Sequence, residues 1–353
     1  MSAMNRTEDY SSLRVGDPVP AFILSDPEGT KWSPLEFDIA GEPVLVLFET
    51  AGPDAAATGL ADILSLAGPL AGKPLTIFHI KPGPLPSSPS PEVSPPGGAG
   101  SSYHLLGDPD GGTFGAYGVV PGSGGALVAV LLDHNCRIAG IAAAAPGESP
   151  AGEISACIDK INNGRAAGAG TPHAPVLVIP RLLDERECQR CIDLWHRYEA
   201  DHRGAGHSDI DEGGKTFLND FGAMKQYLVE EPEPQAWLDS IIGPRVTEEI
   251  SKAFMTRAAN REFYALLRYD SANDGHVRRH RDCATSETEH RRFTVSVMLN
   301  DDYQGGALKF REYSDDLYQL PRGYAVVYSS ALLHEVMPVS AGTRFAIAFH
   351  LYG

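Results

Sequence analysis

The feature that most constrains the fold of this chain is a Gly- and Ala-rich stretch, residues 163–174 (NGRAAGAGTPHA), because the hydrophobic pattern differs on its two sides. Such a stretch buries little apolar surface and is typical of a linker. The chain has 353 residues, a length that suits about two domains. The sequence therefore predicts one domain over residues 12–162, a linker over residues 163–174 and a second domain over residues 175–353.

The first domain has short apolar runs that alternate with helical patterns. The runs at residues 44–48, 75–80 and 126–132 have the length and apolarity of buried strands, and residues 58–70 have a helical pattern. This alternation predicts an α/β domain whose parallel or mixed sheet is covered by helices. A stretch rich in Pro, Gly and Ser at residues 82–102 is interpreted as a long loop within this domain.

The second domain has short strand-like segments that turn residues separate from residue 263 onward. They cover residues 265–269, 292–299, 307–311, 325–328 and 344–351. This pattern predicts a mainly-β sandwich or jelly roll. Before these segments, Asp184 is a suitable cap for an amphipathic helix over residues 185–199.

Cys188 and Cys191 form a Cys-x-x-Cys pair inside this helix. Such pairs occur in redox motifs and zinc sites, but the sequence here has neither the strand-to-helix entry of a redox motif nor a second ligand pair at suitable spacing. A packing role is therefore favoured. The chain has five cysteines, an odd number without a secretory signal, which predicts reduced thiols.

The charge balance narrows the classes of partner. The chain carries 29 basic and 46 acidic residues, for a formal net charge of −17. This excess argues against a nucleic acid or an anionic membrane surface as the main partner. No apolar run reaches the roughly 18 residues of a membrane helix, and the N-terminus has no apolar signal region. The expected location is the cytoplasm.

Four residues of the second domain point to metal chemistry. His280 and Asp282 stand at i and i+2, so on an extended segment both side chains point to the same side. His334 follows a later apolar strand and supplies a third ligand. Two histidines and one carboxylate form the facial triad of non-haem Fe(II) oxygenases, which leaves coordination positions open. Arg344, ten residues further on, offers a guanidinium that binds a carboxylate in bidentate fashion.

The second domain resembles the 2-oxoglutarate/Fe(II)-dependent dioxygenases, in particular their prolyl-hydroxylase-like branch. The matching segments include FYALLRYDSANDGHVRRHRD, RRFTVSVMLNDDYQGGALKF and LPRGYAVVYSSALLHEVMPVSAGTRFAIAFHLYG. The resemblance implies a double-stranded β-helix (jelly roll) with flanking helices. It implies His280, Asp282 and His334 as iron ligands and Arg344 as the partner of the 2-oxoglutarate C5 carboxylate. The cofactors implied are Fe(II), 2-oxoglutarate and O2, with ascorbate as an optional one.

Further cosubstrate contacts follow from the same resemblance. Tyr269 matches a tyrosine that contacts the cosubstrate. Some members carry another tyrosine on the strand before the Leu-Asn turn, where this chain has Met298. Thr294 or Ser296, which share the face of that strand by its period of two, are the candidates for the missing hydroxyl.

The first domain resembles the peroxiredoxin and thioredoxin-like proteins. The matching segments are VGDPVPAFILSDPEGT, VLVLFET and LLGDPDGGTFGAYGVV, in this order. A peroxiredoxin needs a thiolate at the N-terminus of the helix after its first core strand. Residues 49–55 (ETAGPDA) contain no cysteine there, and Cys136 and Cys157 are interpreted as packing residues. We therefore expect a non-catalytic scaffold that binds a protein partner or a second copy of the chain.

The activity implied for the whole chain is hydroxylation of an unactivated C–H bond in a prolyl or other amino-acid-type substrate, protein-bound or free. The alternative is a redox-sensing or partner-binding module with a regulatory oxygenase-like domain. Arg278, Arg279, Arg281, Arg291 and Arg292 form either a solvated surface or a positive funnel for an anionic ligand. Residues 204–215 (GAGHSDIDEGGK) are either a lid over the site or a surface loop.

Overall fold

A computed structural model describes residues 13–36, 38–66, 75–85, 102–122, 125–163, 173–201 and 222–353. The chain forms two compact units. The first comprises Met1–Pro172 with Arg311–Ser314, and the second comprises His173–Phe310 with Asp315–Gly353. Most of the predicted loop at residues 82–102 and of the predicted linker at residues 163–174 lies outside the described residues.

The first unit contains a seven-stranded mixed sheet in the order β2-β1-β5-β4-β3-β6-β7. The strands are β1 (Leu24–Ser25), β2 (Lys31–Trp32), β3 (Val44–Glu49), β4 (Thr76–Pro82), β5 (Ser102–Asp108), β6 (Leu127–Leu132) and β7 (Ile138–Ala144). Strands β3, β4 and β5 are parallel, and the other pairs are antiparallel. The helices are α1 (Pro53–Leu66), α2 (Gly112–Ala116) and α3 (Ala151–Asn163).

The sheet of the first unit has a hydrophobic cluster on each face, and strand β3 contributes side chains to both. All six of its residues are buried, as expected for a strand that is covered on both faces. Val46 and Phe48 join one hydrophobic cluster, whereas Leu45 and Leu47 join a second cluster that includes side chains of α1 and α3. The near-continuous apolar run in the sequence is the consequence of this double burial.

The second unit is built on an antiparallel sheet in the order β8-β17-β13-β20-β11-β9, with β10 also paired to β20. The strands are β8 (Leu177–Ile179), β9 (Lys225–Leu228), β10 (Asn260–Arg261), β11 (Ala265–Asp270), β13 (Phe293–Met298), β17 (Ala325–Ser329) and β20 (Thr343–Tyr352). A smaller sheet has the order β12-β18-β15-β16, and β14 pairs with β19. These are β12 (Val277–His280), β14 (Gln304–Gly305), β15 (Leu308–Lys309), β16 (Leu317–Tyr318), β18 (His334–Val336) and β19 (Val339–Ala341). The remaining elements are α4 (Glu185–Asp201), α6 (Pro232–Phe254) and the 3-10 turn η2 (Ser271–Asn273).

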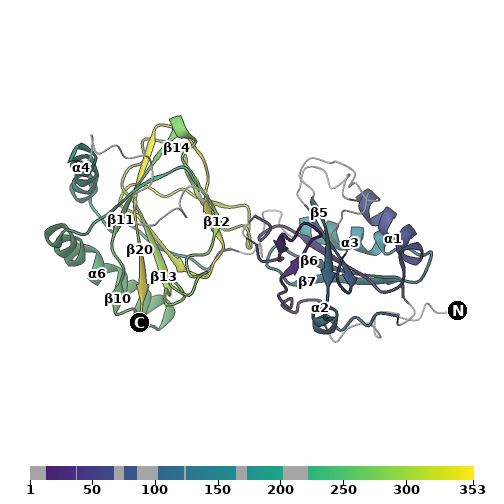
Figure 1. Cartoon of the computed structure of the whole chain (residues 1–353). Helices are drawn as coiled ribbons and strands as arrows, with labels where there is room; N and C mark the ends of the chain where they lie inside the picture. The colour runs from purple at the N-terminus through teal and green to yellow at the C-terminus, as the bar shows by residue number, and fades with distance from the viewer. Residues whose placement is uncertain are drawn as a thin grey trace. The chain divides into compact units, whose positions relative to one another are not determined.

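The two faces of the larger sheet differ in chemistry. Val295, Val297, Ile347 and Phe349 point to one face and join a core cluster with side chains of α4 and α6. In Figure 1 these helices lie on one side of β11, β20 and β13, and β12 lies on the other side. The prediction of a mainly-β second domain with flanking helices is confirmed.

Helix α4 begins with reciprocal capping bonds. The amide of Glu187 donates to Asp184 Oδ1 over 2.7 Å, and the amide of Asp184 donates to Glu187 Oε2 over 2.8 Å. One turn later, Cys188 and Cys191 are fully buried in the core cluster. Burial raises the pKa of the Cys188 thiol to about 12. Both thiols therefore pack as small apolar groups rather than as reactive ones.

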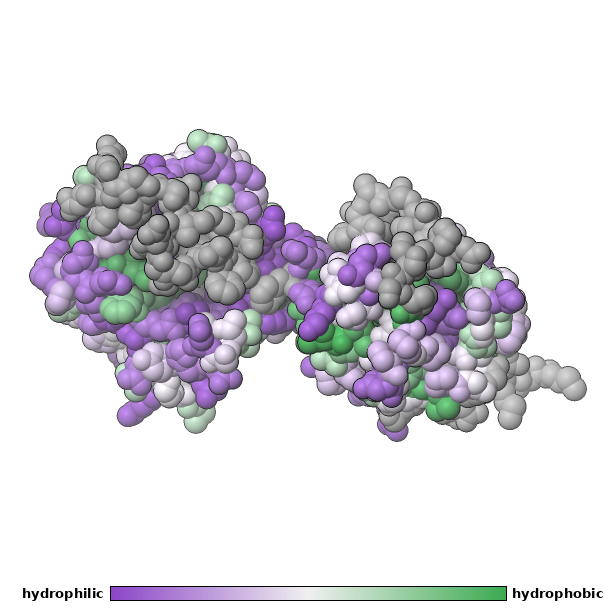
Figure 2. All heavy atoms as spheres, in the orientation of Figure 1, coloured by the Kyte–Doolittle hydropathy of each residue, from purple (hydrophilic) through white to green (hydrophobic). Residues whose placement is uncertain are grey.

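On the face of the molecule seen in Figure 2, hydrophilic residues predominate over the second unit, as expected when most apolar side chains are buried in the core. Hydrophobic residues occupy smaller areas of this face. Within the part of the chain that the structure describes, no helix is both long enough and apolar enough to cross a membrane.

Candidate metal and cosubstrate site

The three predicted metal-binding side chains meet at one place. His280 is the last residue of β12, Asp282 follows two positions later, and His334 is the first residue of β18. Because β12 and β18 pair with His280 opposite His334, the two ring centroids lie 4.3 Å apart. The Asp282 carboxylate lies 3.2 Å from His280 Nε2 and 3.5 Å from His334 Nε2. One candidate ligand atom from each of the three side chains lies within 4.8 Å of the others.

Backbone carbonyls orient both imidazoles. His280 Nδ1 donates to the Arg278 carbonyl over 2.8 Å, and His334 Nδ1 donates to the Leu332 carbonyl over 3.0 Å. A carbonyl oxygen only accepts, so each Nδ1 carries the proton when the ring is neutral. The lone pair is then on Nε2, the atom that faces Asp282, as in many histidine metal ligands.

The electrostatics of the triad suit a divalent cation. Burial raises the pKa of Asp282, but the nearby His334 and a hydrogen bond from His280 outweigh it and hold the carboxyl well below its usual range. Burial lowers the pKa of His334 to about 4, so this imidazole is neutral at pH 7. For His280, the burial that lowers the pKa is outweighed by the hydrogen bond that a protonated Nε2 donates to Asp282, so the pKa is raised, and a cation that binds here takes the place of this proton. A carboxylate and two imidazoles form a donor set that fits Fe(II).

The hydroxyl of Thr294 is bound to the triad itself. It donates to Asp282 Oδ2 over 2.6 Å, and Ser330 Oγ and His350 Nδ1 lie 3.0 Å and 3.2 Å from it. The amide of Asp282 also donates to the Ser330 carbonyl over 2.9 Å. Thr294 therefore holds the carboxylate of a predicted metal ligand, a contact that sequence reasoning did not assign to it. Ser296 is buried two residues further along the same strand face.

Sequence reasoning did not assign Ser330 and His350 to this site. His350 lies directly opposite Thr294 in the register of β13 and β20, so its place follows from strand pairing. Ser330 follows the end of β17 and has no sequence signal of its own. The pairing of β13 with β20 is the signal that would have found His350.

Arg344 is buried with unmet hydrogen-bonding capacity. It is 1% exposed, and its Nε and Nη1 atoms have no hydrogen-bond partner among the described residues. Its Nη2 contacts Met298 Sδ at 3.4 Å, and its guanidinium carbon lies 4.7 Å from the centre of the Tyr269 ring. Leaving a buried charged donor unpaired is costly, so this geometry fits an anionic ligand such as a carboxylate.

Tyr269 and Gly306 shape the space around this guanidinium. Tyr269 lies directly opposite Arg344 in the register of β11 and β20, so both side chains share one face of the sheet. Gly306 has a φ of +67°, and a Cβ added there would lie 2.8 Å from Arg344 Cδ. A side chain at position 306 would therefore displace the arginine.

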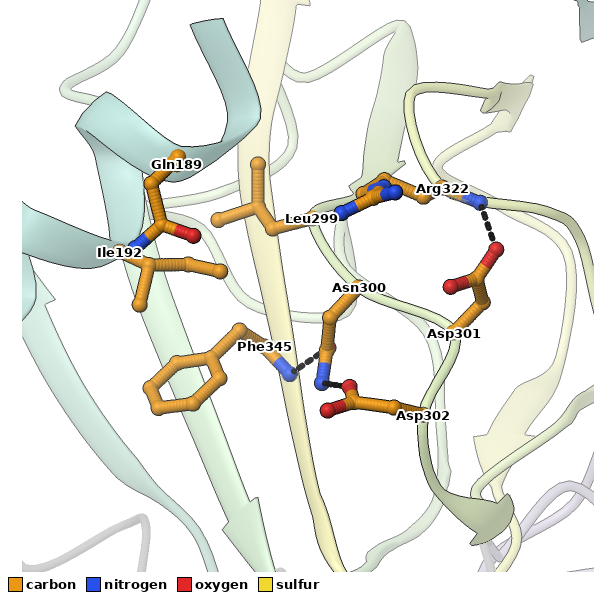
Figure 3. A pocket seen from close by; sticks show the side chains of 8 residues that line it. All are labelled: Gln189, Ile192, Leu299, Asn300, Asp301, Asp302, Arg322 and Phe345. Carbon is orange, nitrogen blue, oxygen red and sulfur yellow. Dashed lines mark hydrogen bonds between the residues drawn. The ribbon is translucent and has the colours of Figure 1, made fainter. Parts of the chain in front are cut away.

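A separate pocket lies on the opposite face of the same sheet. It has a volume of about 380 Å³ and is lined by Gln189, Ile192, Leu299, Asn300, Asp301, Asp302, Arg322 and Phe345 (Figure 3). Phe345 follows Arg344 in the strand, so the two side chains point to opposite faces. None of the triad residues lines this pocket.

Part of the basic cluster has a structural role. Arg291 binds Glu262 through Nε and Nη2, each over 2.7 Å, and its Nη1 donates to the Asp282 carbonyl over 3.0 Å. This arginine fixes the backbone of a metal-binding residue and is not free to capture an anionic ligand. The predicted lid at residues 204–215 lies outside the described residues.

Comparison with known proteins identifies the second unit. Residues 264–352 match the family model of the 2OG-Fe(II) oxygenase superfamily. The C-terminal half of the chain is a 2OG-Fe(II) oxygenase domain, similar to procollagen-lysine dioxygenases and PKHD-type hydroxylases. Its mainly-β sheets match the predicted jelly roll. This family uses Fe(II), 2-oxoglutarate and O2.

Similar proteins include hydroxylases from animals and bacteria. The chain is 29% identical over 182 residues to mouse (Mus musculus) procollagen-lysine,2-oxoglutarate 5-dioxygenase 2, which covers 48% of this chain and 22% of the mouse protein. A PKHD-type hydroxylase of Polaromonas sp. is 31% identical to this chain over 105 residues. This match covers 30% of this chain and 46% of the Polaromonas protein. A Pseudomonas putida prolyl-4-hydroxylase structure superposes with a TM-score of 0.39 at 15% identity, covering 51% of this chain and 92% of that one. The chain thus spans about a fifth of the length of the procollagen-lysine enzyme and under half of the length of the Polaromonas hydroxylase.

Proposed function

We propose that this protein is an Fe(II)- and 2-oxoglutarate-dependent dioxygenase that hydroxylates an unactivated C–H bond of a prolyl or other amino-acid-type substrate. The observation that carries the proposal is the pairing of two features on one side of the sheet. One is the triad of His280, Asp282 and His334, with candidate ligand atoms within 4.8 Å. The other is Arg344, a buried guanidinium with two unpaired nitrogens.

Each residue has a defined task in this proposal. His280, Asp282 and His334 hold the metal through two Nε2 atoms and one carboxylate oxygen. Bound Fe(II) supplies the redox chemistry that couples O2 to oxidation of the cosubstrate and of the substrate C–H bond. Arg344 binds the distal carboxylate of 2-oxoglutarate, and Tyr269 packs against the guanidinium and limits its orientations. Because Arg344 and Tyr269 are buried, water competes poorly for this carboxylate.

The substrate class rests on the relatives. The mouse relative is named for procollagen lysine, an amino-acid side chain within a protein. A peptidyl substrate is therefore the form that we favour over a free amino acid.

The test is an anaerobic titration of the metal-free protein with Fe(II) and 2-oxoglutarate, followed by the weak visible charge-transfer band of the chelate. We expect the band in the parent protein, its loss in His280→Ala and a weaker band in Arg344→Ala. His290→Ala is the matched control, because His290 pairs with Glu262 and is no member of the triad. A folded parent protein that binds Fe(II) but gives no band with 2-oxoglutarate overturns the proposal and favours a binding module.

We also infer that the first unit is a thioredoxin-like domain without thiol catalysis, which serves as a docking or self-association module. Support comes from its sheet order, in which β3 lies between β4 and β6 and is followed in sequence by α1, and from the absence of cysteine at residues 49–55. Peroxide consumption by the chain with a thiol reductant is the test. Turnover that Cys136→Ser or Cys157→Ser abolishes would contradict it, and size-exclusion chromatography reports self-association.

A further inference from the structure

We propose that Asn300 is a positioning residue for Arg344, and through it for the distal carboxylate of the cosubstrate. This inference rests on the function proposed above. Asn300 lies in the turn after β13 and is buried, yet it contributes no atom to the triad. Its side chain instead binds the backbone of β20 on both sides of Arg344.

The register of the sheet shows why such a contact is needed. Strand β13 pairs with β20 as far as Met298, which lies opposite Ala346. In an antiparallel pair this register would place Asn300 opposite Arg344, but the backbone pairing has ended two residues earlier. Only the Leu299 amide continues the ladder, with a 3.0 Å bond to the Phe345 carbonyl.

The Asn300 side chain replaces the missing backbone bonds. Its Oδ1 accepts the Phe345 amide over 2.7 Å, and its Nδ2 donates to the Thr343 carbonyl over 2.7 Å. Nδ2 also donates to Asp302 Oδ1 over 2.6 Å, which fixes the orientation of the amide group. Figure 3 shows Asn300 between Phe345 and Asp302.

The side chain of Phe345 packs against Trp195 and His196 of α4, but a cavity also adjoins this part of β20. The 380 Å³ pocket is lined by Asn300 and Phe345, so open space adjoins the strand here. On the other side, β11 holds the strand, with Tyr269 opposite Arg344 and the Thr343 hydroxyl bonded to Asp270 over 2.8 Å. Together with the Leu299 amide, Asn300 therefore restrains the backbone that aims the buried guanidinium from the side opposite β11.

The consequence concerns selectivity for a dicarboxylate. A guanidinium whose backbone drifts loses the alignment that a bidentate carboxylate pair requires. Without Asn300, the distal carboxylate of 2-oxoglutarate should be held less well, whereas the 2-oxo acid group at the metal should be unaffected. Binding of a 2-oxo acid that lacks the distal carboxylate should therefore be unaffected by loss of Asn300, whereas binding of 2-oxoglutarate should weaken.

The experiment uses four single variants of the 353-residue chain and one double variant. Asn300→Ala removes both bonds to β20, and Asn300→Asp keeps the acceptor for the Phe345 amide but loses the donor to Thr343. Asp301→Ala is the matched control. Asp301 lies in the same turn as Asn300, but its carboxylate accepts a bond from the Arg322 amide and has none to β20 among the described residues. Arg344→Gln defines the full loss of the guanidinium. Circular dichroism checks the fold of each variant.

Calorimetry on the Mn(II)-loaded proteins gives dissociation constants for 2-oxoglutarate and for 2-oxobutanoate, which has no distal carboxylate. We expect Asn300→Ala to bind 2-oxoglutarate on the order of tenfold more weakly, the equivalent of one or two hydrogen bonds. Its affinities for Mn(II) and 2-oxobutanoate should match those of the parent and of Asp301→Ala. Asn300→Asp should weaken 2-oxoglutarate binding at least as much, because its second carboxylate oxygen would face Asp302 and the Thr343 carbonyl, and it decides the matter if Asn300→Ala does not fold.

Equal weakening of both oxo acids, or no weakening of either, overturns the role of Asn300. The double variant Asn300→Ala/Arg344→Gln should bind 2-oxoglutarate no worse than Arg344→Gln alone, and an additive loss also overturns it. The proposed function fails separately, if the parent protein shows no preference for 2-oxoglutarate or if Arg344→Gln keeps that preference.

Discussion

The hydrogen bond from Thr294 to Asp282 gives a quantitative prediction for metal affinity. Thr294→Val keeps the size and β-branched shape of the side chain but removes the hydroxyl that donates to Asp282 Oδ2 over 2.6 Å. Thr294 is 3% exposed, so water does not readily replace the lost donor. The carboxylate then loses one of the contacts that hold it toward His280 and His334.

The size of the effect follows from the charge on the acceptor. Hydrogen bonds to charged groups contribute about 1.5–3 kcal/mol, and a factor of ten in affinity corresponds to about 1.4 kcal/mol. We therefore expect Thr294→Val to weaken metal binding by roughly 10- to 100-fold, the range found for residues that support metal ligands. Thr294→Ser retains the hydroxyl and should recover most of this loss.

The assay is titration of the metal-free protein with Mn(II), in which electron paramagnetic resonance measures the free ion. Ser296→Ala is the matched control, because Ser296 lies on the same face of β13 but has no hydrogen bond to the carboxylate among the contacts of Asp282 described above. Thermal unfolding confirms that each variant is folded. A Thr294→Val protein that binds Mn(II) within twofold of the parent would refute the reasoning.

Three further predictions concern other parts of the chain. Arg344→Gln should raise the KM for 2-oxoglutarate by about 100-fold or more in steady-state assays, because it removes a charged bidentate partner, and should leave Mn(II) affinity unchanged. In mass spectrometry after alkylation of the folded chain, half-buried Cys283 should react, and the fully buried Cys188 and Cys191 should react only after unfolding. Burial raises the pKa of Glu49, but contacts with a histidine and a lysine of β4 outweigh it and set this pKa below the ordinary 4.5. In urea denaturation, the free energy of unfolding should therefore fall as the pH drops below about 4.5. This fall should be smaller in Glu49→Gln, which has no carboxylate to protonate.

The larger strands could be predicted because each contains a run of apolar residues of strand length. The segments predicted at residues 265–269 and 325–328 correspond to β11 (Ala265–Asp270) and β17 (Ala325–Ser329). The two-residue strands β15 and β16 are too short to give a period, and helix α6 (Pro232–Phe254) contains a proline that interrupts its pattern. Their positions follow from tertiary pairing and packing rather than from local sequence.

The candidate site could be predicted where its residues are close in sequence or chemically distinctive. His280 and Asp282 are two positions apart, and a buried arginine near a histidine-carboxylate pair has few alternative roles. The contacts of Thr294 depend on pairing between β13 and β20, which are separated by a long stretch of chain. A single sequence carries no direct record of that register, so the bond from Thr294 to Asp282 could not be predicted, and its contact with the cosubstrate stays a prediction.

The register of β13 against β20 places apolar side chains in the core and polar side chains at the site. Burial of the apolar side chains therefore opposes a change of register at the site. Val295 and Val297 point to the helices, whereas Thr294 and Ser296 point to the face that carries the triad. A slip of β13 by one residue against β20 would bury hydroxyls in the core and turn valines toward the metal ligands. The free energy that opposes such a slip comes from burial of the valine side chains beneath α4 and α6. The apolar face of β13 therefore fixes the position of Thr294, although no core side chain contacts Asp282 through a hydrogen bond.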